Sequence, residues 1–413
     1  MKNKNTIIEA KIGNLNELTK VLSVKEQAQE QLLVVMKALG IGKIVRNLKF
    51  EKAQGYTLTS LFISLLIMRL WGKTIASATS NHFHGLCAVS KNTLYRALLN
   101  ARIDWRMLLT KITLRFHAIF REHQVNTDEH DTCAILDDTT FQKSGIRIEG
   151  VSKVFGHVTH NFINGMKCLT PALSDGKSCY PIDFSLHREK GKKKDYGLTL
   201  KQRKEQFKEK RNAKNPDYAR KAECDESKLE MARRMLCHAV GHGINFKYVL
   251  ADSWFTCESL IQAVRELCGG SVHYIGLVKM NPKLRYQTSK SKRPQNIHEQ
   301  IVRYERTTSC YCRKYKCKYI QLHAKPGEQP IRIFIIKYGR STHWKVLLTT
   351  DTSMNFVRAF ELYERRWGIE VIFKECRGYL GLGKCQSRSY NAQIADTTLC
   401  FMMYQMLSLA KRF

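Results

Sequence analysis

Two short apolar runs that each end in aspartate are the features that most constrain the fold. The run AIL leads into Asp137 and Asp138, and the run YVLA leads into Asp252. Because ligands of open α/β sheets bind beyond the carboxyl ends of the strands, carboxylates in this position commonly line a site. A single aspartate at a strand end is more often a turn or cap residue, and the joint occurrence favours a site. With helix-like segments between the strands, the pattern predicts an α/β core.

A third carboxylate lies in the segment LYERRWGIEVIFKECR, residues 361–376, which has helical periodicity. Its polar residues fall on one narrow stripe. They are Tyr363, Arg366, Glu370, Lys374 and Arg377. The rest of the segment is largely apolar and is expected to be buried. The stripe is either the edge of a functional cleft or a ladder of ion pairs such as Glu370 with Lys374.

Three carboxylates in one place would repel one another unless a cation held them. Asp137, Asp252 and Glu370 are hard oxygen ligands, which suit Mg²⁺ or Mn²⁺. Two such ions together can support displacement at a phosphodiester. The sequence therefore predicts a site for two ions formed by these residues.

The charge of the chain indicates a polyanionic partner. Across 413 residues, 69 Lys and Arg stand against 36 Asp and Glu, giving a formal net charge of +33. Nucleic acid is the leading candidate. A membrane partner is not expected, because we find no long apolar run and no signal peptide, and we expect a cytoplasmic protein. The 14 cysteines are scattered and expected to be reduced, and the cluster of Cys310, Cys312 and Cys317 lacks a fourth zinc ligand.

The N-terminal third has helical periodicity and contains a possible helix-turn-helix. A turn near Gly85 precedes Ser90, a plausible N-cap for the helix that follows. The second helix of such a motif enters the major groove. The candidate DNA contacts are Lys91, Asn92, Thr93, Tyr95 and Arg96. A plain helical bundle is the alternative interpretation.

Two further regions differ in composition. Residues 188–234 are dense in Lys and Arg, which is typical of solvated loops or helices but would also neutralise phosphates. Residues 271–350 alternate like β-structure.

The helical stripe is similar to the Tyr-Arg-Glu-Lys signature, Y-x2-R-x3-E-x6-K, of bacterial insertion-sequence transposases with a DDE catalytic triad. Tyr363, Arg366 and Glu370 match, and Arg377 stands where the family has Lys, with Lys374 as an alternative at a different spacing. LDDTT resembles the first-aspartate motif and LADSWF the second. The family's following Ser or Thr favours Asp137, with Asp138 left open.

The resemblance implies a ribonuclease H-like catalytic core with a β-rich insertion, preceded by an all-helical N-terminal domain. The expected divisions are a helical DNA-binding domain at 1–128, the first part of the core at 129–270, the insertion at 271–350, and the core completion with C-terminal helices at 351–413. Trp344 lies where hairpin-forming relatives place a Trp against a flipped base. The phosphates of the element's ends would contact Tyr363, Arg366 and the final basic residue.

The implied activity is metal-dependent cleavage at the element's ends followed by strand transfer into target DNA, by a homodimer in the bacterial nucleoid. A decayed element acting as a non-catalytic end-binding repressor is one alternative. A stand-alone metal-dependent nuclease is the other.

Overall fold

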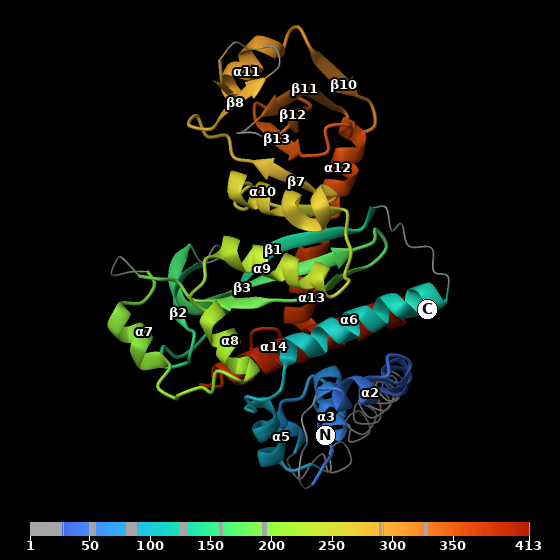
Figure 1. The fold of residues 1–413 in the computed structure, drawn as a ribbon, viewed down its shortest axis with the longest axis vertical. Helices are drawn as coiled ribbons and strands as arrows, with labels where there is room; N and C mark the ends of the chain where they lie inside the picture. Colours follow the sequence, from blue (N-terminus) through green and yellow to red (C-terminus); the bar gives the residue numbers. More distant parts are fainter. Residues whose placement is uncertain are drawn as a thin grey trace, which may run out of the picture.

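The computed structural model describes residues 29–48, 55–79, 89–123, 131–156, 160–191, 196–288, 293–325 and 329–412, together with Gln27 and Ser291. Within them, three tiers follow one another along the longest axis (Figure 1). Helices from the N-terminal part lie at one end, a sheet with helices on both faces lies in the middle, and a β-rich part lies at the other end. None of the described helices is long and apolar enough to cross a bilayer.

Each described element before the first strand is a helix. Residues 29–38 are helical, followed by α2 (Ile41–Arg46), α3 (Leu58–Leu70), α4 (Ile75–Ala78), α5 (Lys91–Leu98) and α6 (Trp105–Glu122). Ser90 caps α5 as predicted, since its Oγ accepts a hydrogen bond from the Thr93 N–H. The expected turn near Gly85 lies outside the described residues, so the helix-turn-helix stays a prediction.

The central sheet is built from both parallel and antiparallel pairs. Its strands are β1 (Cys133–Gln142), β2 (Ser152–Gly156), β3 (Asn161–Ser174), β4 (Cys179–Pro181), β5 (Ser185–His187), β6 (Tyr248–Ala251) and β7 (His273–Val278). The order β2-β3-β1-β6-β7 places β1 antiparallel to β3 and parallel to β6. Strand β6 is buried along its whole length, as its continuous apolar run requires. The α/β class predicted from the two apolar runs is confirmed.

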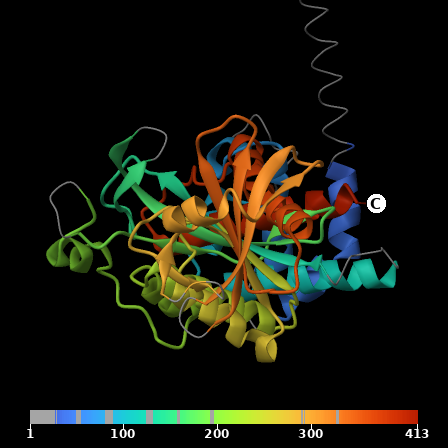
Figure 2. The same ribbon diagram turned by 90° about the horizontal axis from the view of Figure 1, so that it is seen from above.

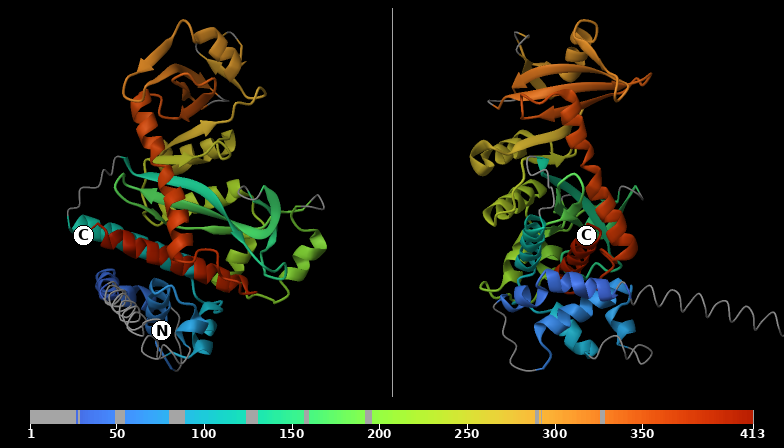
Figure 3. Two further views of the ribbon diagram at one scale, coloured as in Figure 1. Left: turned by 180° about the vertical axis from the view of Figure 1, so that it is seen from behind. Right: turned by 90° about the vertical axis from the view of Figure 1, so that its right-hand side faces the viewer.

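Helices cover both faces of this sheet. On one face lie α9 (Lys228–Gly241) and α10 (Glu258–Glu266), and on the other lies α13 (Trp367–Tyr379) (Figures 1 and 3). Helix α12 (Phe356–Glu364) runs from the β-rich part toward α13. The last helix, α14 (Tyr390–Ala410), packs beside α6 and also contacts α3 and α5, so the C-terminal segment packs on the N-terminal helices.

The β-rich region predicted at 271–350 is present and extends the same sheet. It comprises β8 (Arg285–Thr288), β9 (Gln295–Asn296), α11 (Ile297–Tyr304), β10 (Ser309–Cys312), β11 (Cys317–Lys325), β12 (Ile331–Tyr338) and β13 (Trp344–Thr349). Strand β13 pairs with β7, which also pairs with β6, so one hydrogen-bonded path links this region to the core. Figure 2, seen from above, shows the β-rich strands crossing over the central sheet.

The basic segment 188–234 is more ordered than its composition suggests. It contains α7 (Leu200–Gln206), α8 (Pro216–Glu223) and the start of α9. Three of its arginines form internal ion pairs, Arg188 with Asp225 at 2.8 Å, Arg211 with Glu149 at 2.6 Å and Arg220 with Glu223 at 3.0 Å. The view of the whole segment as a solvated or phosphate-binding run is therefore wrong for these residues. The charges of these three arginines are paired with carboxylates of the protein itself.

Candidate active site

Asp137 and Asp252 lie at neighbouring positions of the sheet. The last residue pair in the parallel pairing of β1 with β6 is Leu136 with Ala251. Asp137 directly follows Leu136, and Asp252 directly follows Ala251. Strand β1 does not end there as expected but continues to Gln142, because β3 still pairs with it on its other side. The carboxylates thus lie where the parallel ladder opens.

The Asp252 carboxylate also organises the turn that follows it. Its Oδ1 accepts hydrogen bonds from the N–H groups of Trp254 at 2.9 Å and Phe255 at 3.3 Å. The turn-forming role that is common for such aspartates therefore coexists with its position beside Asp137.

The polar stripe belongs to two helices rather than one. Tyr363 lies in α12, whereas Glu370 lies in α13, and Arg366 is the residue immediately before α13. Between them the N–H groups of Arg365 and Arg366 bond to carbonyls only three residues back. The backbone is held in this tighter turn while Arg365 Nη1 donates to the Asp131 carbonyl at 2.7 Å. The prediction of a single helix over 361–376 was wrong at this point.

The Arg366 guanidinium lies between two of the three predicted carboxylates. Its Nη1 donates to Asp137 Oδ2 at 2.9 Å, and its Nη2 pairs with Glu370 Oε1. Burial raises the pKa of Asp137 to about 6, against the opposing effect of Arg366 and with the help of the nearby Asp252 charge. Burial therefore disfavours the charged form of Asp137 by more than Arg366 favours it.

The predicted three-carboxylate cluster is not assembled in this arrangement. Across the described residues, no three His, Cys, Asp or Glu side chains are grouped so that they could hold one metal ion. The physical reason is that Arg366 separates Asp137 from Glu370. The chemistry of the donors still fits Mg²⁺ or Mn²⁺, since they are all carboxylate oxygens. Burial destabilises the charged form of Asp137, and a bound cation would offset that cost.

Tyr363 and Arg377 extend the site on either side. The hydroxyl of Tyr363 is buried and has no hydrogen-bond partner among the described residues, and burial raises its pKa to about 12. Arg377 Nη2 pairs with Thr139 Oγ1 and donates to the Thr140 carbonyl at 2.8 Å. Lys374 is exposed. Of the two candidates for the last basic position, the structure brings Arg377 to the strand that carries Asp137.

Lys228 and Trp254 were not selected in the sequence analysis and lie beside these aspartates. Lys228 forms an ion pair with Asp138, and its Nζ lies 4.5 Å from the centre of the Trp254 ring. Trp254 is 46% exposed. Its position two residues after Asp252 was the signal available. Adjacent residues of a strand point to opposite faces of the sheet, so Asp137 faces Arg366 while Asp138 pairs with Lys228.

The other candidate residues belong to elements outside this group of side chains. Trp344 begins β13 and α5 lies among the N-terminal helices, at opposite ends of the molecule (Figure 1). Trp344 is partly buried, with Lys337 Nζ 5.1 Å from its ring centre. On α5, Thr93 is partly buried while the other four candidate DNA contacts are exposed. Trp367, expected to be buried, is 64% exposed because it starts α13 beside the tight turn.

Two family models match this chain. One, described as DDE superfamily endonuclease, matches residues 63–302, more than half of the chain. The other, described as Transposase DDE domain, matches residues 220–406. No curated protein matches the sequence. The two matched ranges together span the elements that carry Asp137, Asp252 and Glu370.

Proposed function

The chain belongs to the DDE superfamily of endonucleases, and from this premise we propose that it is the DNA transposase of an insertion sequence. It would bind the ends of the element, cut the DNA there and join the freed ends to target DNA. The match to a transposase DDE domain supports transposition as the purpose of the cleavage.

One observation carries the proposal. Asp137 and Asp252 follow register-paired residues of two parallel strands, and Glu370 is tied to Asp137 through Arg366. These three carboxylates would hold Mg²⁺ or Mn²⁺. When bound, two such ions supply activation of the attacking oxygen and stabilisation of the leaving oxygen.

The remaining side chains of the site would position DNA. Arg377 and Lys374 are suited to phosphate oxygens, and Arg366 would also contact phosphate once it leaves the carboxylates. The unpartnered Tyr363 hydroxyl can donate a hydrogen bond to a phosphate oxygen. Lys91, Asn92, Thr93, Tyr95 and Arg96 would read the element's end, and Trp344 would stack on an extruded base. Two ends require two active sites, so we propose a homodimer in the DNA complex.

The test uses duplexes that carry the DNA flanking the gene on each side, with Mg²⁺ and a plasmid target. The wild-type protein should cut these duplexes and form strand-transfer products. Asp137→Asn, Asp252→Asn and Glu370→Gln should each slow cleavage by about two orders of magnitude or more while duplex binding is retained. Glu364→Gln, an exposed residue of α12, is the matched control and should cleave normally.

The alternatives give different results. A nuclease would cut without joining, and an end-binding repressor would bind without cutting. Normal cleavage by the three carboxylate variants would rule out the assigned site.

A further inference from the structure

A hollow of about 760 Å³ begins at Asp138 and Thr139 and leads away from the candidate active site. Its floor is the part of β1 that continues past the end of β6. Arg377 borders it near Thr139, and Lys384 and Gln386 border it farther along the chain. We call this the near hollow.

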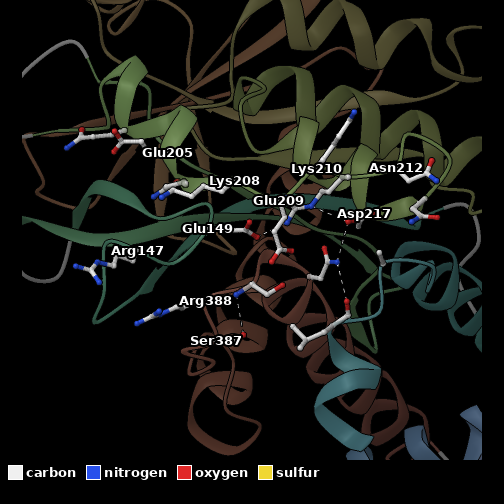
Figure 4. Close-up of a pocket in the computed structure, with 18 of the residues that line it drawn as sticks. Arg147, Glu149, Glu205, Lys208, Glu209, Lys210, Asn212, Asp217, Ser387 and Arg388 are labelled. Atoms are coloured by element: carbon white, nitrogen blue, oxygen red, sulfur yellow. Dashed lines mark hydrogen bonds and ion pairs between the residues drawn. The ribbon is translucent and has the colours of Figure 1, made fainter. Parts of the chain in front are cut away.

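A second cleft, of about 1130 Å³, lies between the core and the N-terminal helices. Arg147, Lys208 and Arg388 line it, and Leu99, just after α5, borders it on the side of the N-terminal helices. Figure 4 shows Arg147, Lys208 and Arg388 extending toward the same side of this cleft. We call it the far cleft.

The near hollow and the far cleft share two walls. On one wall, Lys143 and Ser144 border the near hollow and Ile146 and Arg147 border the far cleft. On the other wall, Lys384 and Gln386 border the near hollow, whereas Ser387 and Arg388 border the far cleft. The two walls meet where Gln386 Oε1 accepts hydrogen bonds from Ser144 N at 3.1 Å and Ser144 Oγ at 3.0 Å.

The second wall presents its charges at regular intervals. Lys384, Gln386 and Arg388 are exposed, and the residues between them are partly buried, an alternation typical of an extended chain. A fully extended chain rises about 3.3 Å per residue, so Lys384 and Arg388 lie at most about 13 Å apart, with a bend at Arg388. A DNA strand advances about 3.4 Å per phosphate along the helix axis, and the same length therefore spans about four nucleotides.

The charges of the two hollows do not cancel. Glu149 and Asp217 are both engaged by Arg211, at 2.6 and 3.1 Å, and Asp138 is engaged by Lys228. Glu205 and Glu209 also line the far cleft, and their side chains form no ion pair with another described residue. No hydrogen bond or ion pair to another described residue engages the side chains of Arg147, Lys208, Lys384 or Arg388, which are all exposed.

A buried cation also borders the far cleft. The Arg211 side chain is only 6% exposed, and its Nη1 has no hydrogen-bond partner in the described part of the chain. A buried guanidinium N–H without a partner is costly, and a phosphate oxygen would accept a hydrogen bond from it, while the charge of Arg211 stays paired with Glu149 and Asp217.

We infer that the near hollow and the far cleft form one track that binds the phosphate backbone of DNA between the active site and the N-terminal helices. The inference rests on the proposed function for the identity of its partner. Lys384, Arg388, Arg147 and Lys208 are the backbone contacts, and Arg377 connects the track to the candidate active site. Contacts of this kind bind without reading sequence and release counterions.

The experiment measures the dissociation constant of a fluorescein-labelled blunt-ended duplex by anisotropy over a series of NaCl concentrations. The variant Lys384→Gln with Arg388→Gln should bind about tenfold more weakly, and the slope of log Kd against log salt should fall by about 1.8, since each lost phosphate contact contributes about 0.9. Arg147→Gln with Lys208→Gln should behave alike. Lys283→Gln with Lys318→Gln, two exposed residues of the β-rich region, is the matched control and should leave the slope unchanged.

Equal slopes for the track variants and the wild type, with unchanged melting temperatures, would overturn the track. A reduced slope in both track variants supports it. The same proteins separate the two proposals, because wild-type protein that binds but never cuts DNA contradicts the transposase while the slopes still test the track. Normal cutting with unchanged slopes contradicts the track alone.

Discussion

Arg366 donates a hydrogen bond to Asp137 across 2.9 Å although the two residues are 229 positions apart in the sequence. The same guanidinium pairs with Glu370, so one cation serves two carboxylates. In the free protein Arg366 offsets the negative charge of these two carboxylates, as a divalent ion bound to the same oxygens would. Metal and Arg366 should therefore compete for Asp137 and Glu370.

The competition predicts that Arg366→Gln makes stability more dependent on Mg²⁺. Without the guanidinium the partly buried Asp137 loses its partner, so the variant should melt below the wild type in EDTA. Mg²⁺ should then raise its melting temperature more than that of the wild type, and a tenfold gain in affinity corresponds to about 1.4 kcal/mol. Arg233→Gln, which removes an exposed pair with Glu266, is the control. Equal Mg²⁺ responses in all three proteins would contradict the competition.

Two glycines of α13 should respond to alanine with opposite signs. A Cβ at Gly368 would lie 2.9 Å from both Cβ and Sγ of Cys179, whereas a Cβ at Gly378 would meet nothing within 4 Å. Gly368→Ala should therefore lower the free energy of unfolding by about 1 to 3 kcal/mol through overpacking. Gly378→Ala should raise it by up to about 1 kcal/mol, because alanine favours the helix. Urea denaturation of both variants measures the difference, and two changes of the same sign would argue against this packing of α13 on β4.

Two arginines of α6, Arg106 and Arg115, should contribute very different amounts to the free energy of unfolding. Arg106 pairs with Asp183 at 2.9 Å and with Glu223, and both acids are buried. Arg106→Met would leave these charges poorly compensated and should cost about 3 to 5 kcal/mol in urea denaturation. Arg115→Met removes an exposed pair with Glu122 on the same helix and should cost less than about 1 kcal/mol. Similar losses from the two changes would contradict the buried network.

His117 should make stability fall in mild acid. Burial, reinforced by Arg121, lowers its pKa from 6.5 to about 4, and its Nε2 lies 2.7 Å from the Tyr180 hydroxyl. Because the unfolded chain binds the proton first, the stability that neutral His117 contributes is complete above pH 6.5 and is lost as the pH falls toward 4. The advantage of wild type over His117→Asn should shrink by up to about 3 kcal/mol across this interval. Chemical denaturation at several pH values tests it, and a constant difference would show that His117 titrates normally.

Local patterns were sufficient to predict the strands that lead into the two aspartates and the cap of α5. Continuous apolar runs before Asp137 and Asp252 indicated buried strands, because only a strand covered on both faces needs such runs. Ser90 was recognisable as a cap from its place before a periodic segment. Each of these signals depends on residues a few positions apart.

Contacts between distant segments decided the rest. Sequence periodicity placed Arg366 on the same stripe as Glu370 but could not show that its guanidinium would lie against Asp137, since that depends on how α13 packs on β1. The same holds for Arg211 and Arg220, whose charges looked available to DNA and instead face Glu149 and Asp183, which are distant in the sequence. The sequence alone determined which residue types this chain has and where its main helices and strands form. Only the tertiary structure decided which charges face one another and which remain free, because the energy of a charge depends on its burial and its nearest partner.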